Sequence, residues 1–288
     1  MLSMASMVNA QTLTLDWKYT EDLPTSAGAR SATGFQGKLW TNDKDAKQLI
    51  YWDEEGKHVV TGAEGASLAG AGTAITVDNA GNLILNGGFP NAASSTTFQI
   101  LPAGGDALID LNVTLPEGVA AGRMDIMGRA IGNVMSEDGG AFFIVPTGGT
   151  KIAKVFVANG AQVAEKTEAS AQTIAVGSIA AADNLTYVQP LDNDVNGWNV
   201  AWRVRTGKDF CYWQDGEAKV YSNAGASTTA GGDIVVLNGV TYTFEPIGTA
   251  YADGFQVVDR STNTVVATHE TECAAVSTAV NLNSATLL

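Results

Sequence analysis

The sequence predicts an all-β protein in which small antiparallel units repeat along the chain. Short apolar segments alternate with turns rich in Gly, Asn and Asp, residues that tolerate the left-handed backbone angles of tight turns. The 288 residues include 32 glycines, 45% are hydrophobic and only 16% are charged. This composition suits a compact protein with many turns and argues against a disordered chain. The third observation is one recurring hairpin unit, best developed at residues 78–85 (DNAGNLIL).

Residues 1–10 have the features of the end of a secretory signal peptide. Val8 and Ala10 are small residues at the positions before a cleavage site, which would leave Gln11 as the mature N-terminus. The positively charged region that opens a signal peptide is absent, so an ordinary apolar N-terminus is the alternative. If residues 1–10 do belong to a signal peptide, we expect its charged region to lie upstream. We therefore expect an exported protein (periplasmic, cell-surface or extracellular) with one domain over residues 11–288.

The predicted strands follow one another at short intervals. Residues 13–19 alternate apolar and polar side chains, as a half-buried strand does. Residues 32–40, 48–52 and 58–61 then form a predicted meander, with turns at 42–47 and 53–57. Further strands are predicted at residues 73–77, 82–86, 96–101, 107–115, 123–127, 132–136, 141–146, 153–158, 185–191, 199–205, 210–214, 218–222, 233–237, 241–246, 254–258 and 265–269.

The spacing of the glycines suggests how these strands are grouped. Gly37, Gly81 and Gly132 are 44 and 51 residues apart, and Gly239 lies 107 residues beyond Gly132, or two more units. A period of about 40–50 residues with about four strands per unit is typical of propeller blades. We predict a β-propeller of antiparallel four-stranded blades, six in number, closed by pairing between its terminal strands. Because residues 281–288 end in an apolar stretch, we expect the natural chain to continue further.

Residues 77–85 (VDNAGNLIL) resemble the D-x-x-G-N-x-hydrophobic segment of NHL-type and related β-propellers of exported bacterial proteins. The likeness is good in this unit and approximate elsewhere, since the units around Gly37 and Gly239 lack the Asp. The resemblance implies a propeller. Such propellers serve as binding scaffolds, as parts of lyases and hydrolases, and as structural modules, so it implies no single activity.

One segment matches half of a calcium-binding loop. Asp192, Asp194 and Asn196, followed by Gly197, occupy positions one, three, five and six of the D-x-[DN]-x-[DN]-G pattern, in which alternate oxygens converge on a hard cation. The twelfth position is Arg203, where the loop requires a bidentate Glu. The alternative is a plain turn, because Asp, Asn and Gly are also turn formers. Calcium is the one cofactor that the sequence suggests.

Aromatic side chains gather in two parts of the chain. The tryptophans concerned are Trp40, Trp52, Trp198, Trp202 and Trp213. Flat rings that stack on sugar faces would give a propeller end a carbohydrate-binding surface. Large rings also fill the space between blades, so core packing is the competing interpretation.

The remaining chemistry-bearing residues match no catalytic motif. His58 and His269 lie outside H-E-x-x-H, and no G-x-S-x-G elbow occurs. Carboxylate pairs such as Glu54/Glu55 and Glu137/Asp138 could serve a glycosidase, but they lie in predicted turns, where solvation explains them. Cys211 and Cys273 could form one disulfide or remain buried thiols.

The charge balance narrows the function classes. Sixteen basic against 30 acidic residues give a net charge of −14, and no Lys/Arg cluster occurs. A nucleic-acid partner is therefore disfavoured, since phosphate binding requires a basic surface. No apolar run reaches the roughly 18 residues of a membrane span.

We predict an exported binding or structural module for a glycan or a protein. The alternative is a propeller-type polysaccharide lyase or hydrolase.

Overall fold

The computed structural model describes most of the chain between residues 32 and 270. The described residues are 32–43, 46, 48–60, 75–86, 95–119, 129–144, 151–170, 185–204, 210–214, 217–221, 233–247 and 254–270. The predicted signal segment, the predicted strands at residues 13–19 and 123–127, and Cys273 lie outside them. So do the side chains of Cys211 and His269, although their backbones belong to described strands.

The described strands form five antiparallel sheets, and each sheet is built from consecutive strands. The first sheet contains β1 (Ala32–Phe35), β2 (Lys38–Asp43), β3 (Gln48–Asp53) and β4 (Gly56–Val59). The second contains β5 (Ile75–Val77), β6 (Leu83–Asn86), β7 (Ser95–Leu101) and β8 (Ile109–Thr114). The third contains β9 (Ile131–Gly132), β10 (Gly140–Ile144), β11 (Ala153–Ala158), β12 (Ala161–Gln162) and β13 (Glu168–Ala169).

The last two sheets each have four strands. The fourth sheet contains β14 (Leu185–Pro190), β15 (Val200–Val204), β16 (Phe210–Gln214) and β17 (Glu217–Tyr221). The fifth contains β18 (Asp233–Leu237), β19 (Val240–Ile247), β20 (Gly254–Asp259) and β21 (Thr264–Glu270). The only helix in the described part of the chain is the 3-10 turn η2 (Ala164–Lys166) between β12 and β13. No described helix is therefore long and apolar enough to cross a membrane.

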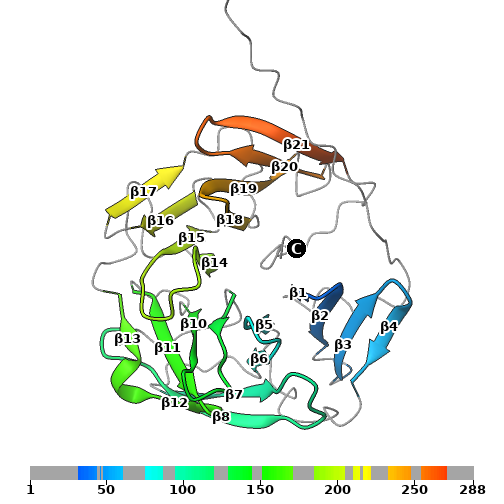
Figure 1. Cartoon of the computed structure of the whole chain (residues 1–288), viewed down its shortest axis with the longest axis vertical. Coiled ribbons are helices and arrows are strands. Elements are labelled where there is room, and N and C mark those ends of the chain that lie inside the picture. The colour runs from blue at the N-terminus through cyan, green and yellow to red at the C-terminus, as the bar shows by residue number, and fades with distance from the viewer. Residues whose placement is uncertain are drawn as a thin grey trace, which may run out of the picture.

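The sheets are arranged as a ring (Figure 1). The first strand of each sheet, for example β1, β5, β14 or β18, lies toward the centre, and strands such as β4, β8 and β21 lie at the rim. A radial array of antiparallel sheets with consecutive strand order is the propeller architecture. The structure thus confirms the predicted all-β class and the propeller arrangement of four-stranded units.

Three of the hydrophobic clusters lie between neighbouring sheets. One cluster joins the first and second sheets through Leu49 and Ile75. A second joins the second and third sheets through Phe98 and Phe142, whose ring centroids are 5.1 Å apart. A third joins the third and fourth sheets through Phe143 and Trp202. The first four sheets therefore bury apolar faces by packing against their neighbours, whereas a small cluster of Phe244, Val257 and Ala267 lies within the fifth sheet.

The glycines used to predict the repeat have the left-handed backbone that the turns require. Gly37 and Gly239 have φ angles of 73° and 78°, and the residues before them, Gln36 and Asn238, are also left-handed. Two successive positive φ angles make the two-residue hairpin turn that suits twisted strands. Gly81 has φ of 91°, so the predicted turn there is confirmed.

Three details of the predicted strands are wrong. The predicted strand 32–40 is two strands, β1 and β2, because the chain reverses at Gln36 and Gly37. Residues 132–136 are not a strand: β9 ends at Gly132, which has φ of 76°, and the backbone then turns. The rim of the third sheet, β12 and β13, was missed, because two-residue strands carry no periodic signal.

Side chains complete the hydrogen bonding at the rim of the third sheet. The side-chain amide of Gln162 donates to the Thr114 carbonyl and accepts from its backbone amide, both at 2.8 Å, so it bonds to β8 as a strand would. On the other side of η2, the Thr167 hydroxyl accepts from the backbone amide of Phe156 at 3.2 Å. These contacts satisfy backbone groups that an interrupted edge strand would leave unpaired.

Candidate functional site

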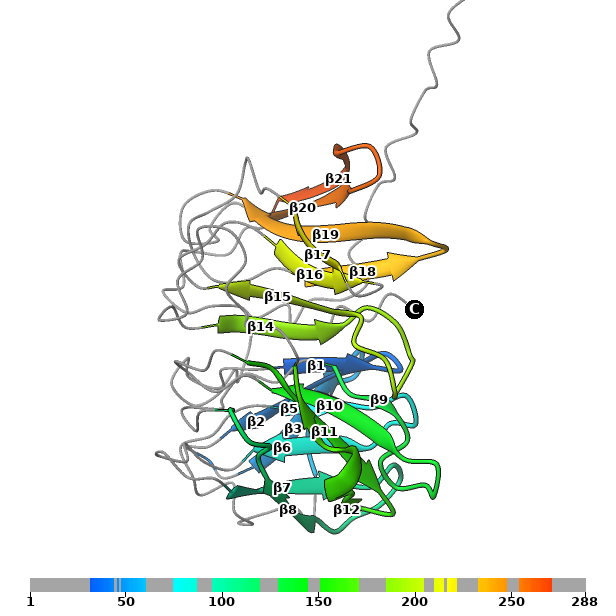
Figure 2. The same ribbon diagram turned by 90° about the vertical axis from the view of Figure 1, so that its left-hand side faces the viewer.

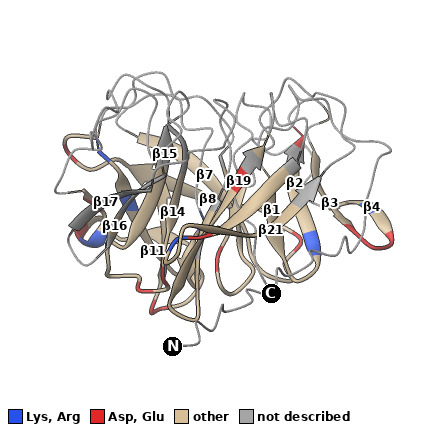
Figure 3. Ribbon diagram, turned by 90° about the horizontal axis from the view of Figure 1, so that it is seen from above, with Lys and Arg blue, Asp and Glu red and all other residues tan. Residues whose placement is uncertain are grey.

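Three turns that carry networks of polar contacts lie at one end of the ring. The β5–β6, β9–β10 and β14–β15 connections are all found on the right-hand side of Figure 2. Acidic residues colour several of the tight turns in Figure 3, including the β3–β4 turn with Glu54 and Glu55. We call this side of the ring the turn end.

Asp78 anchors the β5–β6 turn and joins it to the third sheet. Its side chain is 2% exposed. Oδ1 accepts from the backbone amides of Ala80 and Asn82, both at 2.9 Å. Oδ2 accepts from the Asn82 side chain at 2.7 Å and from the Val134 backbone amide at 2.8 Å. Both oxygens are thus fully used, which assigns the Asp of the D-x-x-G-N segment a structural role.

A chain of asparagines continues this network across the turn end. Asn82 donates to Asn133 at 2.9 Å, and Asn79 accepts from the Gly132 amide at 2.8 Å. Asn79 also donates to the Asn193 side chain at 3.2 Å, and Arg129 donates to the same Asn193 oxygen at 2.6 Å. The second, third and fourth sheets are therefore linked by side-chain amides at this end.

The residues of the predicted calcium loop lie together in the β14–β15 connection. Oδ1 of Asp192 accepts from the backbone amide of Asp194, and Oδ1 of Asp194 accepts from that of Asn196, both at 3.0 Å. Oδ2 of Asp192 accepts from the side chain of Asn199 at 2.6 Å. Such bonds to a residue's own turn are how Asp and Asn shape loops. Among the described residues, no group of three or more His, Cys, Asp or Glu side chains is arranged to hold a metal ion.

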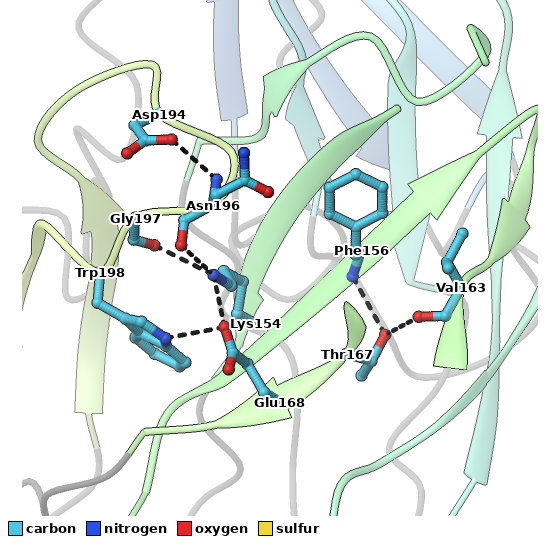
Figure 4. A network of polar contacts seen from close by, with 9 residues as sticks. All are labelled: Lys154, Phe156, Val163, Thr167, Glu168, Asp194, Asn196, Gly197 and Trp198. Carbon is cyan, nitrogen blue, oxygen red and sulfur yellow. Dashed lines mark hydrogen bonds and ion pairs between the residues drawn. The ribbon is translucent and has the colours of Figure 1, made fainter. Parts of the chain in front are cut away.

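A lysine ammonium lies where the same loop presents its carbonyl groups (Figure 4). Lys154 projects from β11, is 2% exposed, and donates to the carbonyl oxygens of Asn196 at 3.0 Å and Gly197 at 3.2 Å. Its third partner is Oε1 of Glu168, at 2.6 Å. An ammonium has three protons, and here each has an acceptor, as a buried charge requires.

Trp198 and Glu168 lie at the solvent-facing side of this lysine. The indole N–H of Trp198 donates to Oε1 of Glu168 at 3.0 Å, so this oxygen accepts from both Trp198 and Lys154. The Lys154 ammonium is 5.0 Å from the centroid of the Trp198 ring, a cation–π distance. Glu168 is half exposed and Trp198 half buried, so both can contact a ligand.

The other predicted tryptophans divide between core and surface. Trp52, Trp202 and Trp213 are buried, and Trp202 packs on Trp213 with ring centroids 4.7 Å apart. These three pack as core residues. Trp40 is half buried in the first sheet, far along the chain from Trp198.

The rings around Trp40 pack against one another, with Tyr51 stacked on His58 and tilted against Trp40. Trp40, Tyr51 and His58 are direct cross-strand neighbours on β2, β3 and β4. The Tyr51 centroid is 4.6 Å from both other rings, and the Lys38 ammonium is 4.3 Å from it. Of the half-buried tryptophans Trp40 and Trp198, Trp198 is the one whose indole N–H bonds to a half-exposed carboxylate, that of Glu168, so we take it as the candidate ligand-binding ring.

His58 bonds to a carboxylate next to these rings. Its Nε2 lies 2.9 Å from Oδ1 of Asp53, an oxygen that also accepts from the Glu55 backbone amide. Desolvation raises the pKa of Asp53, but the hydrogen bonds from His58 and Glu55 and the charges of His58 and Lys38 together lower it by more, so the pKa lies below its usual value.

Comparisons with other proteins identify the fold and no family. No protein-family model matches the chain, and no curated protein is similar to it in sequence. Among solved structures, one similar chain is a structural genomics protein of unknown function from Bacteroides thetaiotaomicron. Its TM-score is 0.54 and its identity 11%, over 87% of this chain and 61% of that chain.

Two further structures are also from Bacteroides. A DUF4623 family protein from Bacteroides eggerthii has a TM-score of 0.51 at 12% identity, over 84% of this chain and 57% of that chain. An auxiliary nutrient binding protein from Bacteroides thetaiotaomicron has a TM-score of 0.45 at 11% identity, over 83% and 57%. The chain thus spans less than two thirds of the length of these proteins, and the likeness concerns the fold alone.

The sequence prediction included residues of the β14–β15 connection but not the side chains that contact it from the third sheet. Trp198, Asp192, Asp194 and Asn196 were predicted and do lie in one loop. Lys154 and Glu168 were not, because Lys154 stands in an apolar strand and its carbonyl partners are more than 40 residues away. A lone Lys inside an otherwise apolar strand is the one signal that could have drawn attention to it.

Proposed function

We propose that the chain is an exported β-propeller binding module that binds a glycan or a protein at its turn end. The observation that carries the proposal is the Trp198–Glu168 pair, a half-buried indole hydrogen bonded to a half-exposed carboxylate. Binding surfaces favour Trp because it combines a large apolar face with a polar N–H group. Lys154 contacts both side chains and holds them in place. Less side-chain conformational entropy is therefore lost when a ligand binds.

Ligand screening of the whole protein tests this proposal. We expect the chain to bind at least one member of a glycan array or one purified surface protein, and the variant Trp198→Ala to bind it at least about tenfold more weakly. Reducing-sugar release and the formation of unsaturated products would be followed in parallel. Release of reducing sugars or unsaturated products from a bound polysaccharide would reject the binding module and favour the alternative, a propeller-type hydrolase or lyase.

Export is part of the proposal and rests on the signal-like residues before Gln11. We expect the intact mass of exported protein to correspond to a chain that begins at Gln11. Exported material that retains Met1 would contradict the assignment of residues 1–10 as a signal segment.

We also propose six blades and kinship with NHL-type propellers. Ile50 and Trp52 are 0% and 3% exposed. They alternate along β3 with Leu49, which packs on the second sheet, so they point to the opposite face of the first sheet. A buried sheet face has a neighbour, and in this proposal that neighbour is a sixth blade formed from both ends of the chain. Truncation after Glu270 should then lower the melting temperature, and an unchanged melting temperature would reject this closure.

A further inference from the structure

We infer that Trp198 and Glu168 form a binding site for neutral glycans that discriminates against glycans carrying carboxylates. This inference rests on the proposed function and specifies its ligand class. It is carried by the hydrogen bonds of three side chains, Lys154, Glu168 and Trp198 (Figure 4).

The Trp198 ring is held rigidly. Its indole N–H is bonded to Glu168, and Lys154 lies over the ring. Phe143 and Trp213 pack edge-on against it, with centroids 6.0 Å and 6.4 Å away and interplanar angles of 71° and 75°. These contacts fix the ring and leave part of it accessible, since the side chain is half buried. The apolar C–H face of a hexose ring can stack on such a surface without further ordering of the protein.

The Glu168 carboxylate supplies the polar half of the site. Oε1 accepts from Lys154 and Trp198, which orients the group. Within the described part of the chain Oε2 has no hydrogen-bond donor, and the side chain is 50% exposed. An ionised oxygen is an acceptor only, so the groups that it can bind are hydroxyl or amide donors on a ligand. Sugar hydroxyls next to a stacked ring are donors of this kind.

The same contacts disfavour an acidic ligand. Lys154, the cation that contacts both side chains, is 2% exposed and directs its protons to Asn196, Gly197 and Glu168, so none remains for a ligand carboxylate. A uronate placed on Trp198 would face the Glu168 carboxylate in a protein whose net charge is −14. Polysaccharide lyases act on uronate residues, so this charge arrangement also argues against lyase chemistry at this site.

Two oligosaccharides of equal length test the inference on the full chain. Cellohexaose is neutral, whereas the α-1,4-linked galacturonate hexamer carries a carboxylate on each ring. Binding is measured by calorimetry and by Trp fluorescence. We expect cellohexaose to bind at least about tenfold more tightly than the galacturonate. We expect Trp198→Ala to weaken cellohexaose binding by about tenfold or more, and Glu168→Gln by a smaller factor.

Two further variants distinguish loss of the binding surface from a general folding defect. Trp198→Phe keeps an aromatic ring and should bind within about threefold of the wild type. Trp40→Ala removes a half-buried tryptophan of the first sheet and should leave binding unchanged. Equal loss in Trp198→Ala and Trp40→Ala would overturn the assignment of the site.

The outcomes separate the inference from the proposed function. Tighter binding of the galacturonate, or a protein ligand lost in Trp198→Ala with no glycan bound, would reject the neutral-glycan class and leave the binding module standing. Failure of the wild type to bind any glycan or protein in the array screen and either hexamer would reject both.

Discussion

The carboxylate of Asp78 accepts a hydrogen bond of 2.8 Å from the backbone amide of Val134, which lies in the β9–β10 turn of the next unit of the ring. The same carboxylate shapes its own turn through Ala80 and Asn82. One side chain thus fixes a turn and the position of the neighbouring sheet. Replacement of either Asp78 oxygen should therefore destabilise the second and third units of the ring together.

Asp78→Asn tests this dual role. The amide nitrogen would meet a donor, either in the turn or at Val134, so we expect a loss of about 2–4 kcal/mol in the free energy of unfolding. Urea denaturation measures it. The control is Asp106→Asn, a change in an exposed residue that should stay within about 0.5 kcal/mol. Equal losses in the two variants would show that the Asp78 hydrogen bonds contribute no more to the free energy of unfolding than an exposed carboxylate does.

Gly81 should be more sensitive to substitution than Gly37, although both have positive φ angles. Gly37→Ala introduces backbone strain of about 1–3 kcal/mol, and its new Cβ meets no atom within 4 Å. Gly81→Ala adds a clash, because the Cβ would lie 2.7 Å from Cε1 of Phe35. We expect Gly81→Ala to cost about 1 kcal/mol more in chemical denaturation. The opposite order would mean that Phe35 moves aside at no cost.

Lys154 and Glu168 should show strong energetic coupling. Lys154→Met leaves the carbonyls of Asn196 and Gly197 without their donor, so we expect a loss of about 2–4 kcal/mol. Glu168→Gln leaves the buried ammonium without its counter-charge. A double-mutant cycle should give a coupling of about 1–3 kcal/mol. The control is Lys166→Met, which removes only an exposed cation–π contact with Phe156 and should cost no more than about 1 kcal/mol. Additive effects of the two changes would reject an interaction between them.

Calcium should not change the stability of the protein. The Oδ1 atoms of Asp192 and Asp194 accept bonds from their own loop, and the Lys154 ammonium occupies two loop carbonyls. A ligand that binds only the folded state raises its stability by mass action. We expect equal melting temperatures in millimolar calcium and in EDTA. An increase that Asp192→Ala abolishes would establish the calcium site instead.

Asp53 should contribute to the acid sensitivity of the first sheet. Its pKa is lowered in the folded state, so the stabilisation is present in full above the unfolded-state value of about 3.9 and is lost as the pH falls through the lower, folded-state value. Asp53→Asn should therefore melt below the wild type at pH 7, and the difference should shrink toward pH 2. Asp138→Asn, in the exposed β9–β10 turn, serves as the control. A difference that persists unchanged at low pH would mean that the charge of Asp53 is not its source.

The sequence was most informative where the residues of a short segment determine its backbone conformation. Strands 153–158, 210–214 and 233–237 were predicted with the bounds that the structure shows. The Asn238-Gly239 turn follows from residues that accept positive φ angles. The Gln36-Gly37 turn has the same geometry, but Gln at the first position gives a weak signal, and the two strands were joined into one.

The site depended on contacts between sheets, which a local pattern does not encode. The five tryptophans were equivalent in the sequence, and only packing separates the buried Trp52, Trp202 and Trp213 from Trp198. The partners of Lys154 come from β13 and from the β14–β15 connection, which meet only because the third and fourth sheets are neighbours in the ring. The Asp78–Val134 contact has the same origin.

Consecutive strand order also has a consequence for how the chain folds. Every described sheet is completed within its own stretch of sequence, and none needs a strand from a distant one. Some contacts between sheets, such as those of Gln162 with Thr114 and of Gln189 with the Ile234 carbonyl, join units that are adjacent along the chain. Because its strands are consecutive, each described sheet can form as it emerges during synthesis and dock on the sheet made before it. Entropy lost in closing long loops is then no obstacle to assembling these sheets.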